Sequence, residues 1–414
     1  MQILTIVLLW LVPASILHAA PWQFEHAVNV AGVESSTTHK IFHHLDSSGR
    51  RNIAASTLGV AVAWEDDRDV TPRIYLAFKP NTEDSFKYAV QISGEGEAYE
   101  PSLVALANNR FVVAWEENSQ IFSRMVEFKG ELRLGPTSQL NKGTAAHVSL
   151  VQHMGHLFAL WSERTGRYGQ IRSQRLSVNT NGTLEPGINC PIDKVPPTDE
   201  QLYPTGVITD NRLVVAWEDR RPKHTIIMAA TELQGGHCRY SEPIRISEKP
   251  ESRNLPYGTG HGVSRVALGR FGSDGVFAAW ADKRDFRDGY DIWGANFSLS
   301  QGGFGTNEKV QDDFGGLSKQ RHATVGGHAK GMLVVAWDDE REGNADIMLS
   351  WRENGEWSED WPLPVASDAG QQSNPSIALD SEGNLHIAWV ERNAIGATTR
   401  LKYAFGKLHT DPGL

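Results

Sequence analysis

The sequence predicts an all-β fold, a seven-bladed β-propeller built from four-stranded antiparallel blades. The main observation is a segment that occurs seven times and ends in a tryptophan, at Trp64, Trp115, Trp161, Trp217, Trp280, Trp337 and Trp389. Successive tryptophans lie about 46 to 63 residues apart, close to the period of propeller blades. Short apolar runs separated by Gly, Asn and Asp turns, without a helical period, predict strands throughout.

The second repeat shows the elements that we expect in each blade. An apolar segment, 101–106, precedes a turn at Asn108 and Asn109, and a continuous apolar strand, 110–115, then ends at the tryptophan. An acidic turn leads to an alternating strand, 120–128, and a more variable fourth strand completes the blade. The continuous strand reads as buried on both faces, which is the environment between packed blades, and its tryptophan is expected to wedge between neighbouring blades.

The two ends of the chain predict how the ring closes. The last repeat, 374–407, supplies only three strands, whereas residues 22–30 resemble the fourth strand of the sixth repeat, 357–365. We therefore expect the N-terminal strand to complete the last blade and residues 39–48 to link it to the first. This gives a single domain, 21–407, followed by a frayed tail, 408–414.

The first 20 residues have the form of a signal peptide, with an apolar run at 3–11 followed by Pro13 and small residues. They predict a secreted or periplasmic protein, and no later segment is apolar enough to span a membrane. The only cysteines, Cys190 and Cys238, lie in adjacent repeats. In an oxidising compartment they can form a disulfide, but the sequence leaves that pairing open.

The charge balance bears on the choice of partner. The chain has 40 Lys and Arg residues against 50 Asp and Glu residues, a net charge of −10. Proteins that bind nucleic acid or anionic membranes show a basic footprint, so this balance argues against both partners.

The pattern of apolar strand, tryptophan, acidic pair and arginine, and especially residues 374–389, NPSIALDSEGNLHIAW, resembles the sialidase-like (BNR-repeat-related) β-propeller superfamily. The resemblance covers nearly the whole chain after the signal peptide and implies a propeller with a ligand site at its centre. True sialidases have six blades, Asp-box hairpins and an early Phe/Tyr-Arg-Ile-Pro motif. This chain has no clean Asp box, and its Pro72-Arg73-Ile74-Tyr75 falls in a third strand, so the sialidase catalytic motifs are missing.

The acidic turn after each tryptophan favours a structural role, because a catalytic device is not needed seven times. Its Asp or Glu can accept hydrogen bonds from turn amides while the following Arg pairs with it.

The residues at the start of each innermost strand are the better candidates for function, because they surround the mouth of the central channel, where a rigid frame presents loops and strand ends. The predicted ligand-binding residues are Arg51, Glu100, His147, Tyr203, His261, Arg321, His322 and Asn374. Arginines can clamp a carboxylate or a sulfate through two hydrogen bonds. Glu100 and Tyr203 are candidates for a base and nucleophile pair, and His261 for proton transfer.

A metal site is the remaining alternative. His43, His44, His147, His261 and His322 are its candidate ligands, with copper or zinc as the metal that imidazole favours. No local spacing of these histidines matches a known zinc motif.

The sequence thus favours a secreted or periplasmic propeller that binds a small polar or carbohydrate-like ligand at the channel mouth, without an assigned cofactor. Two alternatives stay open. One is a carbohydrate-active enzyme, a glycoside hydrolase or a polysaccharide lyase, at the same site. The other is a periplasmic copper- or zinc-binding protein.

Overall fold

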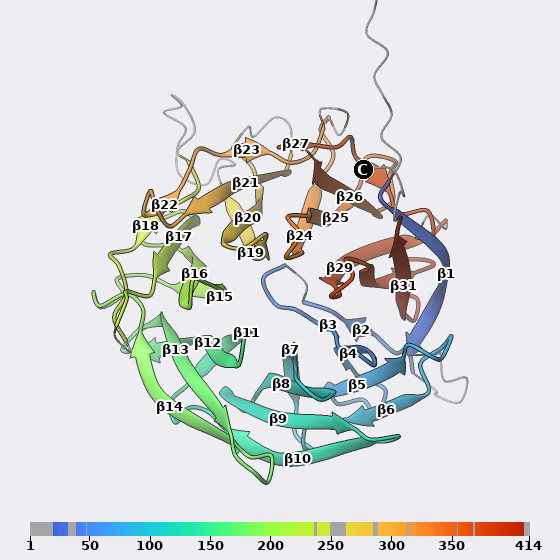
Figure 1. Cartoon of the computed structure of the whole chain (residues 1–414), viewed down its shortest axis with the longest axis horizontal. Coiled ribbons are helices and arrows are strands. Elements are labelled where there is room, and N and C mark those ends of the chain that lie inside the picture. Colours follow the sequence, from blue (N-terminus) through green and yellow to red (C-terminus); the bar gives the residue numbers. More distant parts are fainter. Residues whose placement is uncertain are drawn as a thin grey trace, which may run out of the picture.

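The structure, a computed structural model, is a seven-bladed β-propeller, as the repeats predict. It describes residues 20–31, 39–46, 48–235, 238–248, 262–284, 289–312, 314, 316–353, 355–366 and 369–409. Seven antiparallel sheets surround a central channel, and every named element of the described residues is a strand (Figure 1).

The strands of each blade follow one another from the channel outward. Blade 1 comprises β2 (His43–His44), β3 (Ile53–Ala55), β4 (Gly59–Asp66), β5 (Arg73–Pro80) and β6 (Tyr88–Gln91). Blade 2 comprises β7 (Ala98–Leu106), β8 (Arg110–Glu117), β9 (Gln120–Phe128) and β10 (Leu132–Gln139). Blade 3 comprises β11 (Ala145–His153), β12 (His156–Thr165), β13 (Tyr168–Val178) and β14 (Leu184–Pro191). Blades 4 and 5 comprise β15 (Gln201–Thr209), β16 (Arg212–Asp219), β17 (Ile226–Thr231) and β18 (Ile244–Arg245); and β19 (Val263–Phe271), β20 (Gly275–Asp282), β21 (Asp291–Ser298), β22 (Gly303–Phe304) and β23 (Glu308–Lys309). Blades 6 and 7 comprise β24 (Gln320–Gly327), β25 (Leu333–Asp339), β26 (Asp346–Glu353), β27 (Glu356–Trp357) and β28 (Trp361–Pro362); and β29 (Gln371–Leu379), β30 (Leu385–Arg392), β31 (Arg400–Leu408) and β1 (Trp22–Ala31).

Three blades divide one of their four positions between two short strands. In blade 1, β2 and β3 both pair with β4. His43 and His44 therefore belong to the sheet, whereas the sequence had placed them in a linker. In blades 5 and 6 the outer position is divided between β22 and β23 and between β27 and β28. In blade 7 the outer position is held by β1, which pairs antiparallel with β31 from Trp22 opposite Leu408 to Ala31 opposite Leu401.

The hydrophobic core lies between blades. Each of the seven clusters of buried apolar side chains joins two neighbouring blades. The seven repeat tryptophans at the ends of the second strands are all fully buried, with 0% exposure. Truncating a buried side chain of this size to alanine costs about 3–5 kcal/mol, so the repeated tryptophan is a main source of blade-to-blade stability.

The acidic residue two positions after the tryptophan fixes the end of each second strand. In six blades this carboxylate accepts a hydrogen bond from the indole Nε1, at 2.7 Å for Trp64 and Asp66 and at 3.1 Å for Trp337 and Asp339. Asp339 also accepts from the backbone amide of Arg341 at 2.9 Å and pairs with that arginine's side chain at 2.7 Å. The predicted structural role of the acidic turn is confirmed, and the indole is an additional donor that the sequence did not indicate.

Cys190 and Cys238 form a disulfide, with their Cα atoms 5.0 Å apart. The bridge ties the outer strand of blade 3 to the segment that follows β17 in blade 4. Over the residues that the structure describes, no helix is long and apolar enough to cross a membrane.

Candidate functional site

A loop of blade 1, residues 45–52, enters the central channel and is called the plug here; its residue 47 is not described. Figure 1 shows this segment, before β3, crossing the centre of the ring. The carbonyl of Gly49 accepts hydrogen bonds from Thr205 of blade 4 at 3.0 Å and from Ser149 of blade 3 at 3.3 Å. A Cβ at position 49 would lie 2.5 Å from the carbonyl oxygen of Val266, so only glycine fits this close approach. The plug divides the channel into a mouth and an opposite end.

The side chains at the mouth are presented by a β-bulge near the start of each innermost strand in blades 2 to 7. The bulged residues are Glu100, His147, Tyr203, Arg265, His322 and Asn374. All six have left-handed backbone angles, with φ between 51° and 62°. Residues other than glycine adopt this conformation at an energetic cost, and such strain is concentrated at functional sites.

The residue directly after the tryptophan holds the next bulge in place. Where this residue is acidic, its carboxylate accepts a hydrogen bond from the backbone amide of the bulged residue in the following blade. The four pairs are Glu65 with Glu100, Glu116 with His147, Glu218 with Arg265, and Asp338 with Asn374. Each of these acidic residues therefore links two blades, because its backbone belongs to one blade and its carboxylate positions the mouth residue of the next.

Arg50 of the plug is the centre of the charged network at the mouth. Its guanidinium pairs with Asp46 at 2.9 Å, with Glu116 at 3.5 Å and closely with Glu100. Only 3% of its side chain is exposed. Burial lowers the pKa of Arg50, but the charges of these three carboxylates outweigh burial and leave that pKa above its ordinary value.

Glu100 and Glu116 also form a hydrogen bond with each other, so the pair holds one proton. Burial raises the pKa of Glu116; Arg50 opposes the shift, but the neighbouring charge of Glu100 adds to it and that pKa ends above its ordinary value. For Glu100, burial is outweighed by Arg50, His147 and the hydrogen bonds, and its pKa ends below its ordinary value. Glu100 is thus the ionised partner and Glu116 the protonated one.

Beside this network, Tyr203 lies between a neutral ring and a cation. Its ring centroid is 4.0 Å from that of His147, and the guanidinium carbon of Arg265 lies 3.6 Å from the centroid of Tyr203. Arg265 is anchored by Asp46 at 3.3 Å and keeps 26% of its side chain exposed. Burial and the charge of Arg50 lower the pKa of His147 to about 3, and burial raises the pKa of Tyr203, so both rings are uncharged at neutral pH.

The structure brings together three of the predicted site residues, Glu100, His147 and Tyr203. Two more, His322 and Asn374, meet at Asp338: His322 Nδ1 lies 2.6 Å from this carboxylate, and the amide of Asn374 donates to it at 2.9 Å. Arg321 lies over the ring of Tyr290, 5.1 Å from its centroid.

The prediction for Arg51 needs correction, whereas that for His261 stays a prediction. Arg51 does not face the mouth; it lines the cavity at the opposite end of the channel, and the neighbouring Arg50 takes the mouth position. His261 lies outside the described residues, and the bulge of blade 5 is at Arg265. Sequence analysis also missed Asp46 and Glu116. The acidic residue after the tryptophan, present in four of the seven copies, is the pattern that indicates Glu116.

The proposed metal ligands do not converge in the described part of the chain. His43 is buried against Thr399 in blade 7, with its Nδ1 3.1 Å from the hydroxyl, and His44 lies beside Glu65. Among described residues, no group of three or more His, Cys, Asp or Glu side chains is arranged to hold a metal ion.

Comparison with known proteins identifies the architecture only. No family model and no curated protein matches the sequence. The structure is similar to that of the polysaccharide lyase Uly1, with a TM-score of 0.60, 8% identity, and 94% of this chain and 100% of that chain covered. It is similar to a protein of unknown function from Dyadobacter fermentans, with a TM-score of 0.57, 11% identity and the same coverage. NanB sialidase from Streptococcus pneumoniae matches less well, with a TM-score of 0.48, 9% identity, and 88% of this chain and 70% of that chain covered. At these identities the first two likenesses show a shared β-propeller fold.

Proposed function

We propose that the channel mouth binds a carboxylated polysaccharide and cleaves it by β-elimination, as a polysaccharide lyase. The observation that carries the proposal is the stack of His147, Tyr203 and Arg265, which places two uncharged proton carriers beside a partly exposed guanidinium. Elimination next to a carboxylate requires these three elements: a cation for the carboxylate, a base and an acid.

The roles follow from the charge states. Arg265 binds the carboxylate of a uronate residue and stabilises the negative charge that develops on it. Neutral His147 takes the proton from the carbon next to the carboxylate. The electron pair of that C–H bond forms the new C=C bond, the bond from the β carbon to the glycosidic oxygen breaks, and the hydroxyl of Tyr203 gives its proton to that oxygen. The bound carboxylate raises the proton affinity of His147 at the moment when it acts as the base.

A glycoside hydrolase at this site is less compatible with the geometry. Hydrolysis by the common mechanisms uses two carboxylates that flank the glycosidic bond, about 5–9.5 Å apart. Glu100 and Glu116 instead both pair with the guanidinium of Arg50, so each carboxylate is already engaged in an ion pair.

Two further observations support the proposal. Uly1, which is named a polysaccharide lyase, has the same fold over 94% of this chain. The disulfide between Cys190 and Cys238 and the signal-peptide pattern of the first 20 residues support an oxidising location outside the cytoplasm, where polysaccharides are met.

The test is a panel of uronate-containing polysaccharides incubated with the protein, with ultraviolet absorbance measured for the unsaturated product and reducing ends measured in parallel. His147→Gln and Tyr203→Phe are each expected to lower turnover by about 10²–10⁴-fold while folding is retained. His156→Gln, a histidine of the same blade at the other end of its strands, is the matched control and keeps full activity.

Three results contradict the proposal in different ways. New reducing ends without the absorbance indicate a hydrolase. Saturable binding without turnover indicates a binding protein, which is the function that the sequence favours. Activity that survives both substitutions removes His147 and Tyr203 from the reaction.

A further inference from the structure

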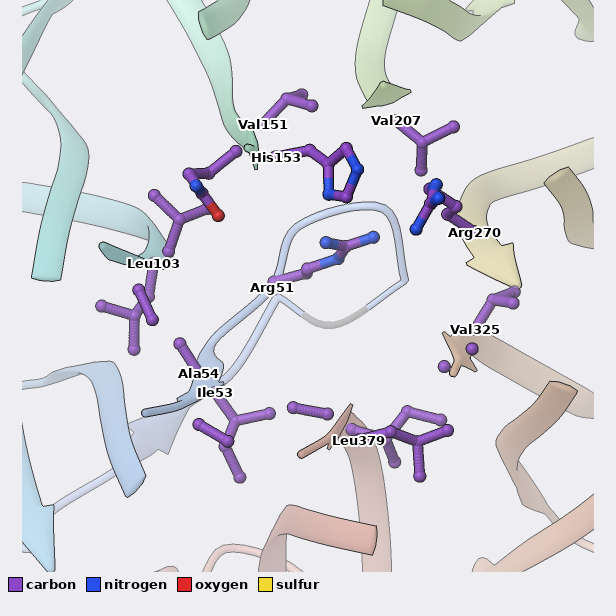
Figure 2. A pocket seen from close by; sticks show the side chains of 18 of the residues that line it. Arg51, Ile53, Ala54, Leu103, Val151, His153, Val207, Arg270, Val325 and Leu379 are labelled. Carbon is purple, nitrogen blue, oxygen red and sulfur yellow. The ribbon is translucent and has the colours of Figure 1, made fainter. Parts of the chain in front are cut away.

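A second cavity lies at the opposite end of the channel, beyond the plug. Its volume is about 260 Å³, and all seven innermost strands contribute to its wall (Figure 2). The wall is formed mostly by Ile, Val, Leu, Ala and Gly residues of these strands. Its polar side chains are those of Gln152 and of three basic residues, Arg51, His153 and Arg270.

Arg51 extends over the centre of this cavity from the plug, as Figure 2 shows. Its guanidinium donates one hydrogen bond, to the carbonyl of Leu268 at 3.2 Å. Burial lowers the pKa of Arg51, and among the described residues no carboxylate opposes this effect. The backbone is fixed as well, since the carbonyl of Arg51 accepts a hydrogen bond from the amide of Leu103 at 2.7 Å.

Arg270 adds a second positive charge to this cavity, and His153 adds an imidazole that can donate a hydrogen bond. The guanidinium of Arg270 donates a hydrogen bond to the carbonyl of Ser273, and its Nε is buried without a hydrogen-bond partner among the described residues. The pKa of His153 is lowered by burial and then by the charge of Arg270. Among the described residues that line this cavity, no side chain is acidic.

A buried cation without a counter-ion is costly, whereas an anion at the same place restores the balance and gains charge-assisted hydrogen bonds. Two guanidinium groups also match the geometry of an oxyanion, because each can donate two parallel hydrogen bonds. The volume is below the roughly 300–1,000 Å³ of sites for drug-sized ligands, which favours a small species.

We propose that this cavity is an anion site, which binds a small oxyanion such as phosphate, sulfate or a short carboxylate between Arg51, Arg270 and His153. The site is separated from the mouth by the plug, and it does not depend on the function proposed for the mouth. An anion held by Arg51 also bears directly on the plug, because Arg51 and Arg50 are neighbours in it.

The experiment measures binding of phosphate, sulfate and acetate to the full chain by calorimetry and by thermal stabilisation, at constant ionic strength with chloride as the reference salt. Arg51→Met and Arg270→Met are each expected to weaken oxyanion binding by about tenfold or more. Arg133→Met, which removes an exposed arginine from an outer strand, is the control for net charge and keeps wild-type binding.

Comparison of the three anions shows which chemical class of anion the cavity prefers. Preference for acetate over phosphate and sulfate assigns a carboxylate ligand, and the reverse assigns an inorganic one. The proposal is overturned if no oxyanion stabilises the protein more than chloride, or if Arg270→Met, measured with the wild-type fold confirmed by circular dichroism, binds as tightly as the wild type. Arg270→Met gives this answer even if Arg51→Met does not fold.

Discussion

Arg50 and Arg51 are adjacent in sequence and lie in the same plug, yet the two ends of the channel treat them in opposite ways. Arg50 faces three carboxylates at the mouth, and its pKa is raised. Arg51 faces a cavity whose described lining has no acidic side chain, and its pKa is lowered. At the mouth the charges thus balance one another within the protein. At the opposite end the positive charge of Arg51 requires a ligand for balance.

The difference also indicates which end suits which chemistry. At the mouth the charged groups are already paired, which holds the rings of His147 and Tyr203 in place, as the proposed lyase reaction requires. At the opposite end the unpaired cations favour a resident anion. Substitutions that affect the two ends unequally therefore test the comparison.

The largest expected effect is the contrast between Arg50→Met and Arg51→Met. Removal of Arg50 takes the cation away from Glu100 and leaves Asp46 with Arg265 alone, which is expected to lower the free energy of unfolding by about 3–5 kcal/mol. Arg51→Met removes an unpaired buried charge, so in buffer free of oxyanions the stability is expected to stay the same or rise. Chemical denaturation of the two variants in parallel measures both values. Equal losses would show that the two ends are electrostatically alike.

A smaller effect is expected from Gly49→Ala, which acts on the plug and not on either charge. The added methyl group meets the backbone of Val266 and the side chain of Thr205, so the plug must shift, at a cost of about 1–3 kcal/mol. Because Gly49 lies between the mouth and the opposite cavity, the proposed lyase turnover and the proposed oxyanion binding are both expected to weaken. Gly130→Ala, at an open turn where nothing lies within 4 Å, is a control for added volume, although its positive φ of 76° carries its own strain. If only turnover or only oxyanion binding weakens, the plug does not couple the mouth to the opposite cavity.

The sequence could predict the ring but not the plug. The repeat identifies the seven blades and five of the six bulged residues, because each lies at a nearly constant interval before its tryptophan. The same interval points to Arg265, which precedes Trp280 as Glu100 precedes Trp115, and not to His261. Blade 1 breaks the rule because the plug replaces the start of its innermost strand, and no repeat in the sequence encodes which way Arg50 and Arg51 face.

Contacts between blades were the other missing part. Glu116 lies in the second strand of blade 2, and its carboxylate meets the bulge amide of His147 in blade 3. A pattern read within one repeat cannot show a bond whose partners belong to two repeats. The same applies to Asp46, which joins Arg50 to Arg265 across the channel.

The smallest expected effect concerns the proton that Glu100 and Glu116 share. Folding raises the pKa of Glu116 from an ordinary value of 4.5 to about 8, because of burial and the charge of Glu100. Below the ordinary value both the folded and the unfolded chain carry this proton, and the contribution to stability is fully present. As the pH rises toward 8 the unfolded chain loses the proton first, so this contribution is progressively lost.

Glu116→Gln imitates the protonated acid: its amide oxygen can accept from the amide of His147 and its NH₂ group can donate to Glu100. The variant has no proton to lose, so its stability relative to the wild type is expected to increase steadily between pH 5 and pH 8. The lowered pKa of His147 destabilises the folded state of both proteins as the pH falls from 6.5 toward about 3, and the lowered pKa of Glu100 acts only below its ordinary value of 4.5. Urea denaturation across this pH range measures the difference. A difference that stays constant with pH would mean that Glu116 is ionised in the folded protein, so that Asp46, Glu100 and Glu116 would carry one more negative charge than Arg50 and Arg265 balance.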